Sequence, residues 1–185
     1  MISIYDDLLY GTIQSYGAPR GMSIPDFFGL ANAVMGVESN YNPNAVSYTG
    51  AGIGLMQINP FIPGYVEGYT REDLFKPELN VALGVRILRD YINQYGLNQG
   101  LGSYFAGPTN RATAAAMRYA QKVLNFFRNI RSRVMTLFKR TDFDPSSGEW
   151  ITADPFYSSE LELESAVYQE SEQDFPWWMA LLFFI

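Results

Sequence analysis

The residues between Ser23 and Gln57 constrain the fold of this chain more than any other part of its sequence. Ser23 is a preferred N-cap residue, and Pro25 suits the first turn of an α-helix. Apolar side chains then recur at helical spacing, at Phe27, Leu30, Ala31 and Val34. This pattern predicts a buried helix that ends near Glu38. A polar segment follows it and contains Gly50, Gly52 and Gly54.

Glu38 is a candidate general acid because of its place at the end of this helix. A carboxylate there faces the negative end of the helix dipole, and burial against Met35 and Leu55 would disfavour the charge further. Both effects raise the pKa and keep the carboxyl group protonated. A protonated carboxyl group beside glycines, whose backbone a ligand can approach closely, is suited to proton donation.

The chain contains no cysteine and no histidine. This composition excludes disulfide bonds, thiol nucleophiles, Ser-His triads and the usual zinc sites. Acid–base chemistry therefore has to rest on Asp, Glu, Lys or Tyr side chains. We expect neither a metal ion nor a cofactor.

Apolar spacing predicts further helices on both sides of a loop. Residues 2–16 form an opening helix that packs beside the one described above. Residues 59–75 are rich in Pro, Gly and Tyr and predict a loop that lines a cleft. Pro77 begins a core helix that Gly96 ends, with an apolar stripe of Val81, Val85, Leu88 and Ile92. Residues 111–140 hold eight basic residues and no acidic one, and we expect a pair of amphipathic helices there.

Charge divides the chain into two parts. Residues 1–140 contain all 13 basic residues and 9 acidic ones, whereas residues 141–185 contain 10 acidic residues and no basic one. We therefore predict a folded domain over 1–140 and an acidic linker and tail over 141–185. The tail ends in the apolar residues 177–185, for which we expect docking on a protein partner. The alternatives are membrane contact and folding of the tail back onto the basic residues 111–140. Nucleic acid is not an expected partner.

The segment 38–58 carries a recognisable pattern: Glu-Ser-x-aromatic-x-Pro-x-Ala-x-Ser, then Gly-Ala, then Gly-Leu-Met-Gln-Ile. This pattern resembles that of lytic transglycosylases of the soluble (SLT) type. The matching residues are Glu38, Ser39, Tyr41, Pro43, Ala45, Ser47, Gly50, Ala51, Gly54, Leu55, Met56, Gln57 and Ile58. The chain has one residue more than the family pattern between Ala51 and Gly54.

Three more motifs follow in the order of that family. Residues 73–84 resemble Asp-Leu-x-x-Pro-x-x-Asn-Ile-x-x-Gly, and residues 104–108 resemble Tyr-Asn-Ala-Gly-Pro with Phe105 in place of the Asn. Tyr119 begins a stretch similar to the closing Tyr-Val-x-x-Val element. The resemblance covers about residues 27–123.

The resemblance implies a mainly α-helical, goose-lysozyme-like catalytic domain over residues 1–140, with a small irregular or β element. It also implies cleavage of the β-1,4 bond between N-acetylmuramic acid and N-acetylglucosamine in peptidoglycan glycan strands. Glu38 would protonate the leaving glycosidic oxygen and then accept a proton from the C6 hydroxyl of the muramyl sugar, which gives a 1,6-anhydro product. Tyr119 occupies the position that lies beside the catalytic glutamate in relatives.

Five further residues are candidates for substrate binding. Ser47 and Gln57 are candidates for contacts to the muramyl sugar and its acetamido group. Tyr41, Tyr104 and Met56 are candidates for packing against sugar faces, and simple core packing is the alternative for each of them.

Two other functions stay open at this point. Most glycosidases use two carboxylates, so a hydrolytic muramidase would place a second carboxylate opposite Glu38. The nearest spare carboxylates are Glu67, Glu72, Asp73 and Glu78, of which we expect Asp73 to be structural. An inactive structural virion protein is the other alternative. Phe105 and the extra residue near Gly52 keep this alternative open. The intact set of Glu38, Gln57, Tyr104 and Tyr119 argues against it.

Residues 1–20 carry Asp6 and Asp7 and lack a basic residue ahead of a continuous apolar run. They do not predict a secretory signal peptide. We therefore expect a phage particle to carry the enzyme for local wall opening during genome entry, with action in the host periplasm and cell wall. Delivery through a lysis pore is the alternative. Other virion proteins are then the expected partners of residues 141–185.

Overall fold

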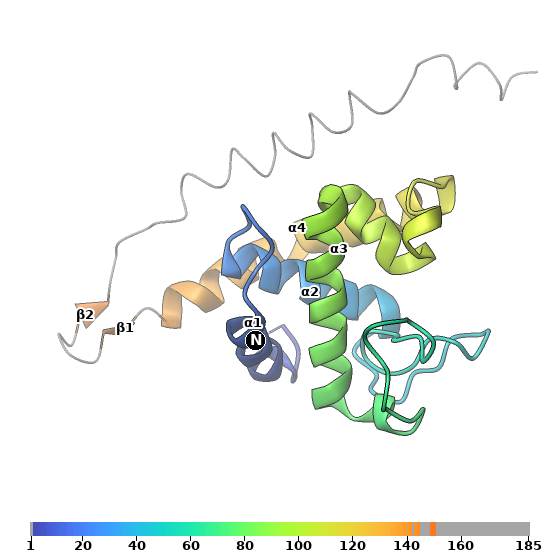
Figure 1. The fold of residues 1–185 in the computed structure, drawn as a ribbon. Coiled ribbons are helices and arrows are strands. Elements are labelled where there is room, and N and C mark those ends of the chain that lie inside the picture. Colours follow the sequence, from blue (N-terminus) through green and yellow to red (C-terminus); the bar gives the residue numbers. More distant parts are fainter. Residues whose placement is uncertain (1, 142, 145–148, 151–185) are drawn as a thin grey trace, which may run out of the picture. The chain divides into compact units, whose positions relative to one another are not determined.

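The computed structural model describes residues 2–141, 143–144 and 149–150, and these residues are mainly helical (Figure 1). The four α-helices of this part are α1 (Asp6–Tyr16), α2 (Ile24–Ser39), α3 (Pro77–Ala106) and α4 (Ala114–Thr141). Two short 3-10 helices, η1 (Asp73–Phe75) and η2 (Pro108–Asn110), flank α3. The strands β1 (Phe143–Asp144) and β2 (Glu149–Trp150) pair antiparallel. The predicted mainly α fold class is confirmed.

Helix α2 is the most buried element, and its predicted start is confirmed. The Ser23 hydroxyl accepts a hydrogen bond from the Asp26 backbone N–H at 3.2 Å, as an N-cap residue does. Every residue from Pro25 to Gly36 is buried. The helix ends where Asn40 adopts a left-handed conformation and its N–H donates to the Gly36 carbonyl at 3.0 Å. Glu38 therefore lies in the last turn of α2.

Helix α4 is one continuous helix, which corrects the expected pair of helices over residues 111–140. Residues 114–141 contain neither glycine nor proline, so no residue in this range breaks the helix. Phe127 and Val134 face α2, where a Cβ atom added to Gly29 would come within 2.5 Å of the Phe127 ring. Arg128 and Arg133 are exposed, so the helix is amphipathic as predicted.

Helix α3 changes direction at Gly96, the residue predicted to end it. Gly96 has φ 75° and ψ 175°, which is non-helical, but the helix resumes and continues to Ala106. The predicted stripe of Val81, Val85, Leu88 and Ile92 is buried, which confirms the core role of the first part of α3. In the second part, Gly102 packs closely against Met117 of α4, and residues 103–106 line the same cavity as Glu38 at the end of α2.

Helix α1 begins at Asp6, four residues later than predicted, and packs on α2 and α3. The buried Asp6 carboxylate accepts hydrogen bonds from the Ile2 and Ser3 backbone N–H groups at 2.6 and 3.1 Å. It also accepts one from the Asn32 side chain of α2 at 3.0 Å. This buried network fixes the start of the chain to the middle of α2.

Residues 40–76 connect α2 to α3 mostly without regular structure. Isolated β-bridges join Val46 to Ile53 and Ile53 to Ile58, and the Ile53 side chain is fully buried. These bridges correspond to the small β element that the resemblance implied.

All described elements belong to one unit, which spans residues 1–151. Most of the predicted acidic tail, including the docking segment 177–185, lies outside the described residues. Within the described part, no helix is long and apolar enough to cross a membrane.

Candidate active site

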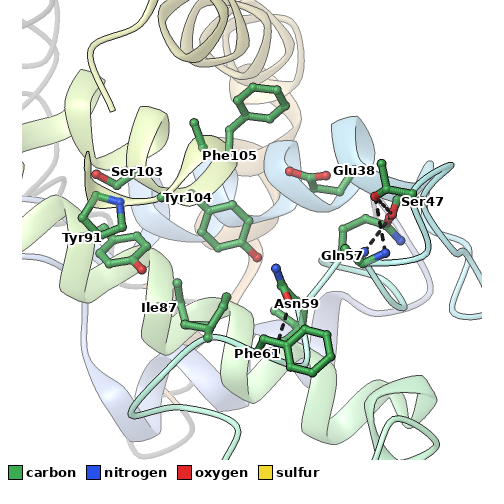
Figure 2. A pocket seen from close by; sticks show the side chains of 18 of the residues that line it. Glu38, Ser47, Gln57, Asn59, Phe61, Ile87, Tyr91, Ser103, Tyr104 and Phe105 are labelled. Carbon is green, nitrogen blue, oxygen red and sulfur yellow. Dashed lines mark hydrogen bonds between the residues drawn. The ribbon is translucent and has the colours of Figure 1, made fainter. Parts of the chain in front are cut away.

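A cavity of about 500 Å³ lies beside the C-terminal end of α2 (Figure 2). Glu38 lines it from α2, and residues 47–63 line it in part from the connecting loop. Ile87 and Tyr91 line it from the first part of α3. Residues 103–106 line it from the second part of α3, and Gly107 and Pro108 line it from the segment that follows. The kink of α3 at Gly96 allows a single helix to line the cavity with both of its parts.

The Glu38 carboxyl group accepts a hydrogen bond from the Tyr119 hydroxyl of α4, with 2.5 Å between the two oxygens. Burial raises the Glu38 pKa to about 7, although the Tyr119 hydrogen bond and the Lys122 charge oppose this shift. Glu38 is therefore about half protonated near neutral pH. This suits a group that donates a proton in one step and accepts one in the next. Burial and the nearby Glu38 raise the pKa of Tyr119 well above its usual value, so its hydroxyl stays a donor.

Glu38 is the only carboxylate among the described residues that line the cavity. The spare carboxylates Glu67, Glu72, Asp73 and Glu78 are not part of the lining. Asp73 accepts hydrogen bonds from the Thr70 N–H and hydroxyl at 2.9 and 2.7 Å and from Lys76 at 2.6 Å. These bonds lower its pKa and agree with the structural role expected for Asp73.

The described residues also offer no group of three or more His, Cys, Asp or Glu side chains that could hold a metal ion.

Asn80 of α3 holds the loop that forms one wall of the cavity. Its fully buried side chain accepts a hydrogen bond from the Met56 N–H at 2.7 Å. It donates to the carbonyl groups of Ile53 at 2.8 Å and Leu74 at 2.7 Å. Gly54 has φ 76°, and an added Cβ atom there would clash with the Asn80 amide, so only glycine fits this turn. Four of these five residues, Gly54, Met56, Leu74 and Asn80, belong to the first two sequence motifs, which thus specify how the loop folds.

The end of α2 is fixed to the same loop by Ser39. Its hydroxyl donates to the Leu55 carbonyl at 2.7 Å. Leu55 and Met35 are fully buried, as expected for apolar neighbours that keep water away from Glu38.

Ser47 and Gln57, two predicted substrate contacts, both line the cavity. The Ser47 hydroxyl accepts a hydrogen bond from the Gly52 N–H at 2.8 Å. The Gln57 side-chain amide donates to the carbonyl groups of Ala45 and Gly54, at 3.2 and 3.0 Å. Both side chains therefore hold the loop as well as face the cavity (Figure 2).

The three residues predicted to pack on sugar faces have different surroundings. Tyr104 lines the cavity, and its hydroxyl donates to the Met56 carbonyl at 2.8 Å. Met56 is fully buried and does not line the cavity, so its side chain belongs to the core. Tyr41 does not line the cavity either, because its hydroxyl points to Asn32 of α2 and donates to it at 2.9 Å. The structure thus shows the alternative, core packing, for Met56, whereas Tyr41 is half-buried and lies outside the cavity.

Several cavity residues were not predicted as site residues, namely Asn59, Phe61, Ile87, Tyr91 and Phe105. Residues 59–75 were expected to line a cleft, and Asn59 and Phe61 do so. Ile87 and Tyr91 are four residues apart and share a helix face, but this spacing does not distinguish a cavity wall from the core. Phe105 stacks on Tyr119, with ring centroids 4.8 Å apart and an interplanar angle of 16°.

The sequence profile of the transglycosylase SLT domain family matches residues 28–127. This range is more than half of the chain and contains Glu38, the loop held by Asn80, and Tyr119. The chain therefore belongs to the transglycosylase SLT domain family. No curated protein sequence matches it significantly.

Two solved structures share the fold. The 70 kDa soluble lytic transglycosylase Slt70 from Escherichia coli matches 70% of this chain with 24% identity and a TM-score of 0.54. An inactive mutant of lytic transglycosylase Slt from Pseudomonas aeruginosa matches 72% of this chain with 21% identity and a TM-score of 0.53. The matched part covers 24% of each of those two proteins. These likenesses establish a lytic-transglycosylase fold for the part of the chain that carries the cavity.

Proposed function

We propose that this protein is a peptidoglycan lytic transglycosylase that uses Glu38 as its only acid and base. The observation that carries the proposal is that no second carboxylate accompanies Glu38 in the described lining of the cavity. The pKa of Glu38 is about 7, and the Tyr119 hydroxyl holds its carboxyl group at 2.5 Å. Membership of the transglycosylase SLT domain family supports the assignment.

The reaction follows from one carboxyl group acting twice. Protonated Glu38 donates its proton to the glycosidic oxygen as the bond from that oxygen to C1 of N-acetylmuramic acid breaks. The Glu38 carboxylate then removes the proton of the C6 hydroxyl of the same sugar. The C6 oxygen forms a bond to C1, which gives the 1,6-anhydro product and restores protonated Glu38. Water is not consumed.

The protein environment supports both steps. A pKa of about 7 is close to neutral pH, so donation and acceptance are both accessible. The Tyr119 hydrogen bond fixes the rotamer of Glu38 and stabilises its carboxylate form after the first proton transfer. Lys122 also favours the carboxylate through its positive charge. Tyr104 and Ile87 add apolar surface to the cavity walls near this group.

The test is to incubate purified peptidoglycan with the wild type and with Glu38→Gln, and to identify the released ends by mass spectrometry. We expect 1,6-anhydro ends from the wild type. The rate of the variant should fall by about ten-thousand-fold or more, the upper end of the contribution of a positioned acid, because an amide has no acidic proton to transfer. Cleavage by the variant within tenfold of wild type would exclude Glu38 from the mechanism.

The same experiment separates the alternatives. Reducing ends in place of anhydro ends would identify a hydrolytic muramidase, for which the described cavity lining offers no second carboxylate. Intact peptidoglycan after incubation with the folded wild type would indicate an inactive structural protein.

We also propose that the enzyme is a virion component of a phage, acts on the host wall during genome entry, and binds other virion proteins through residues 141–185. The support is the sequence alone: the acidic residues 141–185 follow a basic domain and end in the apolar segment 177–185. Mass spectrometry of purified particles tests the proposal. Detection of the protein only in lysing cells, and not in particles, would contradict it.

A further inference from the structure

Phe105 is an unusual wall residue of the cavity, because a neighbouring ring holds its aromatic ring in place while much of the side chain stays exposed to solvent. It lies in the last turn of α3, lines the cavity, and is 52% exposed. Its ring stacks on Tyr119 with 4.8 Å between the ring centroids and an angle of 16° between the planes. Tyr119 thus covers one face of the ring, and the exposed fraction belongs to the rest of it.

The position of this ring relates it to the reacting group. The Tyr119 ring that supports Phe105 also carries the hydroxyl that is bonded to Glu38. Figure 2 shows Phe105 on one side of Glu38, whereas Asn59 and Phe61 lie on the other side. A chain of sugars that passes Glu38 along the cavity would therefore meet Phe105 next to the bond to be cleaved.

We propose that Phe105 is a specificity-determining substrate contact whose open surface packs against a sugar ring beside Glu38. This inference rests on the function proposed above. The less polar face of a sugar ring presents C–H groups, which pack well on the electron-rich face of an aromatic ring. Because the stack with Tyr119 already holds the Phe105 ring in place, little side-chain entropy is lost on binding.

This contact recognises the shape of a sugar face and makes no hydrogen bond to its substituents. The Phe105 side chain has no donor or acceptor, so it does not discriminate between hydroxyl and acetamido groups at that place. We therefore expect the subsite at Phe105 to accept sugars that differ in their polar substituents.

Binding is measured in the full chain with Glu38→Gln, so that glycan strands of uncross-linked peptidoglycan stay intact. In this background, Phe105→Leu should weaken the affinity for the strands by about tenfold, because it removes the aromatic face and keeps an apolar side chain. Phe105→Tyr keeps the ring and should bind within about twofold of the parent. Tyr69→Leu is the matched control, because Tyr69 is 49% exposed but does not line the cavity, and its affinity should not change.

A second measurement separates contact with the substrate from support of Tyr119. In proteins that retain Glu38, Phe105→Leu should raise KM and leave the alkaline limb of the pH profile unchanged. If Phe105 only supported Tyr119, the affinity would be unchanged, and kcat and the alkaline limb would change; this result overturns the inference and leaves the proposed function intact. If the parent with Glu38→Gln binds no glycan strands at all, the proposed function fails, and this inference fails with it.

Discussion

At Glu38, the burial that prepares a proton donor also makes the folded protein less stable at high pH. Its pKa rises from 4.5 to about 7 in the folded state, so folding favours the protonated form. The folded state thus binds more protons than the unfolded state between these two values. The contribution of Glu38 to stability is highest below about pH 4.5 and falls as the pH rises through about 7.

Glu38→Gln should therefore stabilise the protein at alkaline pH. The amide carries no charge at any pH and can still accept the Tyr119 hydrogen bond, so the cost of burying a carboxylate disappears. At pH 8 we expect a gain of up to about 3 kcal/mol in the free energy of unfolding, since one pKa unit corresponds to about 1.4 kcal/mol. Urea unfolding of both proteins at pH 4 and pH 8 measures the difference. An equal difference at the two pH values would show that Glu38 is not protonated by burial.

Tyr119 affects the same equilibrium in the opposite direction. Its hydrogen bond lowers the Glu38 pKa, so Tyr119→Phe should raise that pKa and move the alkaline limb of the activity profile to higher pH. The lost hydrogen bond, worth about 1 kcal/mol, should reduce the rate by about fivefold. Initial rates of peptidoglycan cleavage between pH 5 and pH 9 check both effects. An unmoved alkaline limb with an unchanged rate would assign Tyr119 to packing alone.

At the scale of elements, the cavity depends on the contact between α3 and the loop before it. Asn80 is the only side chain among the described residues that bonds to the backbone of Ile53, Met56 and Leu74 together. All three bonds are buried, so the backbone groups have no access to water that could replace the side chain. One substitution in α3 therefore acts on the whole loop.

Asn80→Ala should reduce the free energy of unfolding by about 3 kcal/mol, because it leaves the Met56 N–H and the Leu74 carbonyl buried and unpaired. It also removes one of the two hydrogen bonds to the Ile53 carbonyl, which keeps the bond from the Ile58 N–H. Glycan cleavage should fall with it, since Ser47 and Gln57 belong to the same loop. Asn129→Ala is the matched control, because Asn129 is an exposed residue of α4, and it should change stability by less than about 0.5 kcal/mol. Chemical denaturation measures both. A loss below about 1 kcal/mol for Asn80→Ala would show that the loop folds without this side chain.

The elements that could be predicted are those whose start or end is encoded locally. Ser23 and Pro25 mark the start of α2, and Gly96 marks the kink of α3. Beyond Gly96, α3 continues in a new direction, and Gly100 packs closely against the backbone of Ile92 across the kink. No local pattern contains that contact. The expectation of two helices over residues 111–140 was wrong. The sequence itself indicates a single helix α4, since residues 114–141 include no glycine or proline.

The site could be predicted in part for the same reason. Glu38, Ser47, Gln57 and Tyr104 belong to motifs, and the structure brings them to one cavity. Met56 does not line that cavity, because its side chain is on the other side of the loop, where it is buried against Gly84 of α3. Such a choice between two sides of an irregular loop has no sequence period, in contrast to the two faces of a helix.

For the whole molecule, the end of the described core and the change in charge along the chain fall close together in the sequence, at Val134 and after Arg140. All buried apolar residues of the described structure lie between Leu9 and Val134. The 13 basic residues lie within 1–140, and 10 acidic residues with no basic one lie within 141–185. The net charge of the whole chain is −6, but that of residues 1–140 alone is +4, because they contain only 9 acidic residues. The part that contains the cavity and Glu38 is therefore the part that carries positive charge.

A chain that ends at Arg140 should keep its fold and its activity and lose its partner. It retains every buried apolar residue of the described core and the contact between Tyr119 and Glu38, so we expect an unfolding temperature and a cleavage rate close to those of the full chain. It lacks the apolar segment 177–185, whose aromatic and aliphatic side chains are the kind that anchor protein interfaces. Incorporation into particles, measured by mass spectrometry against the full chain, should then be lost. Unfolding of the shortened chain would place residues 141–185 in the domain core, and normal incorporation would exclude them as the docking segment.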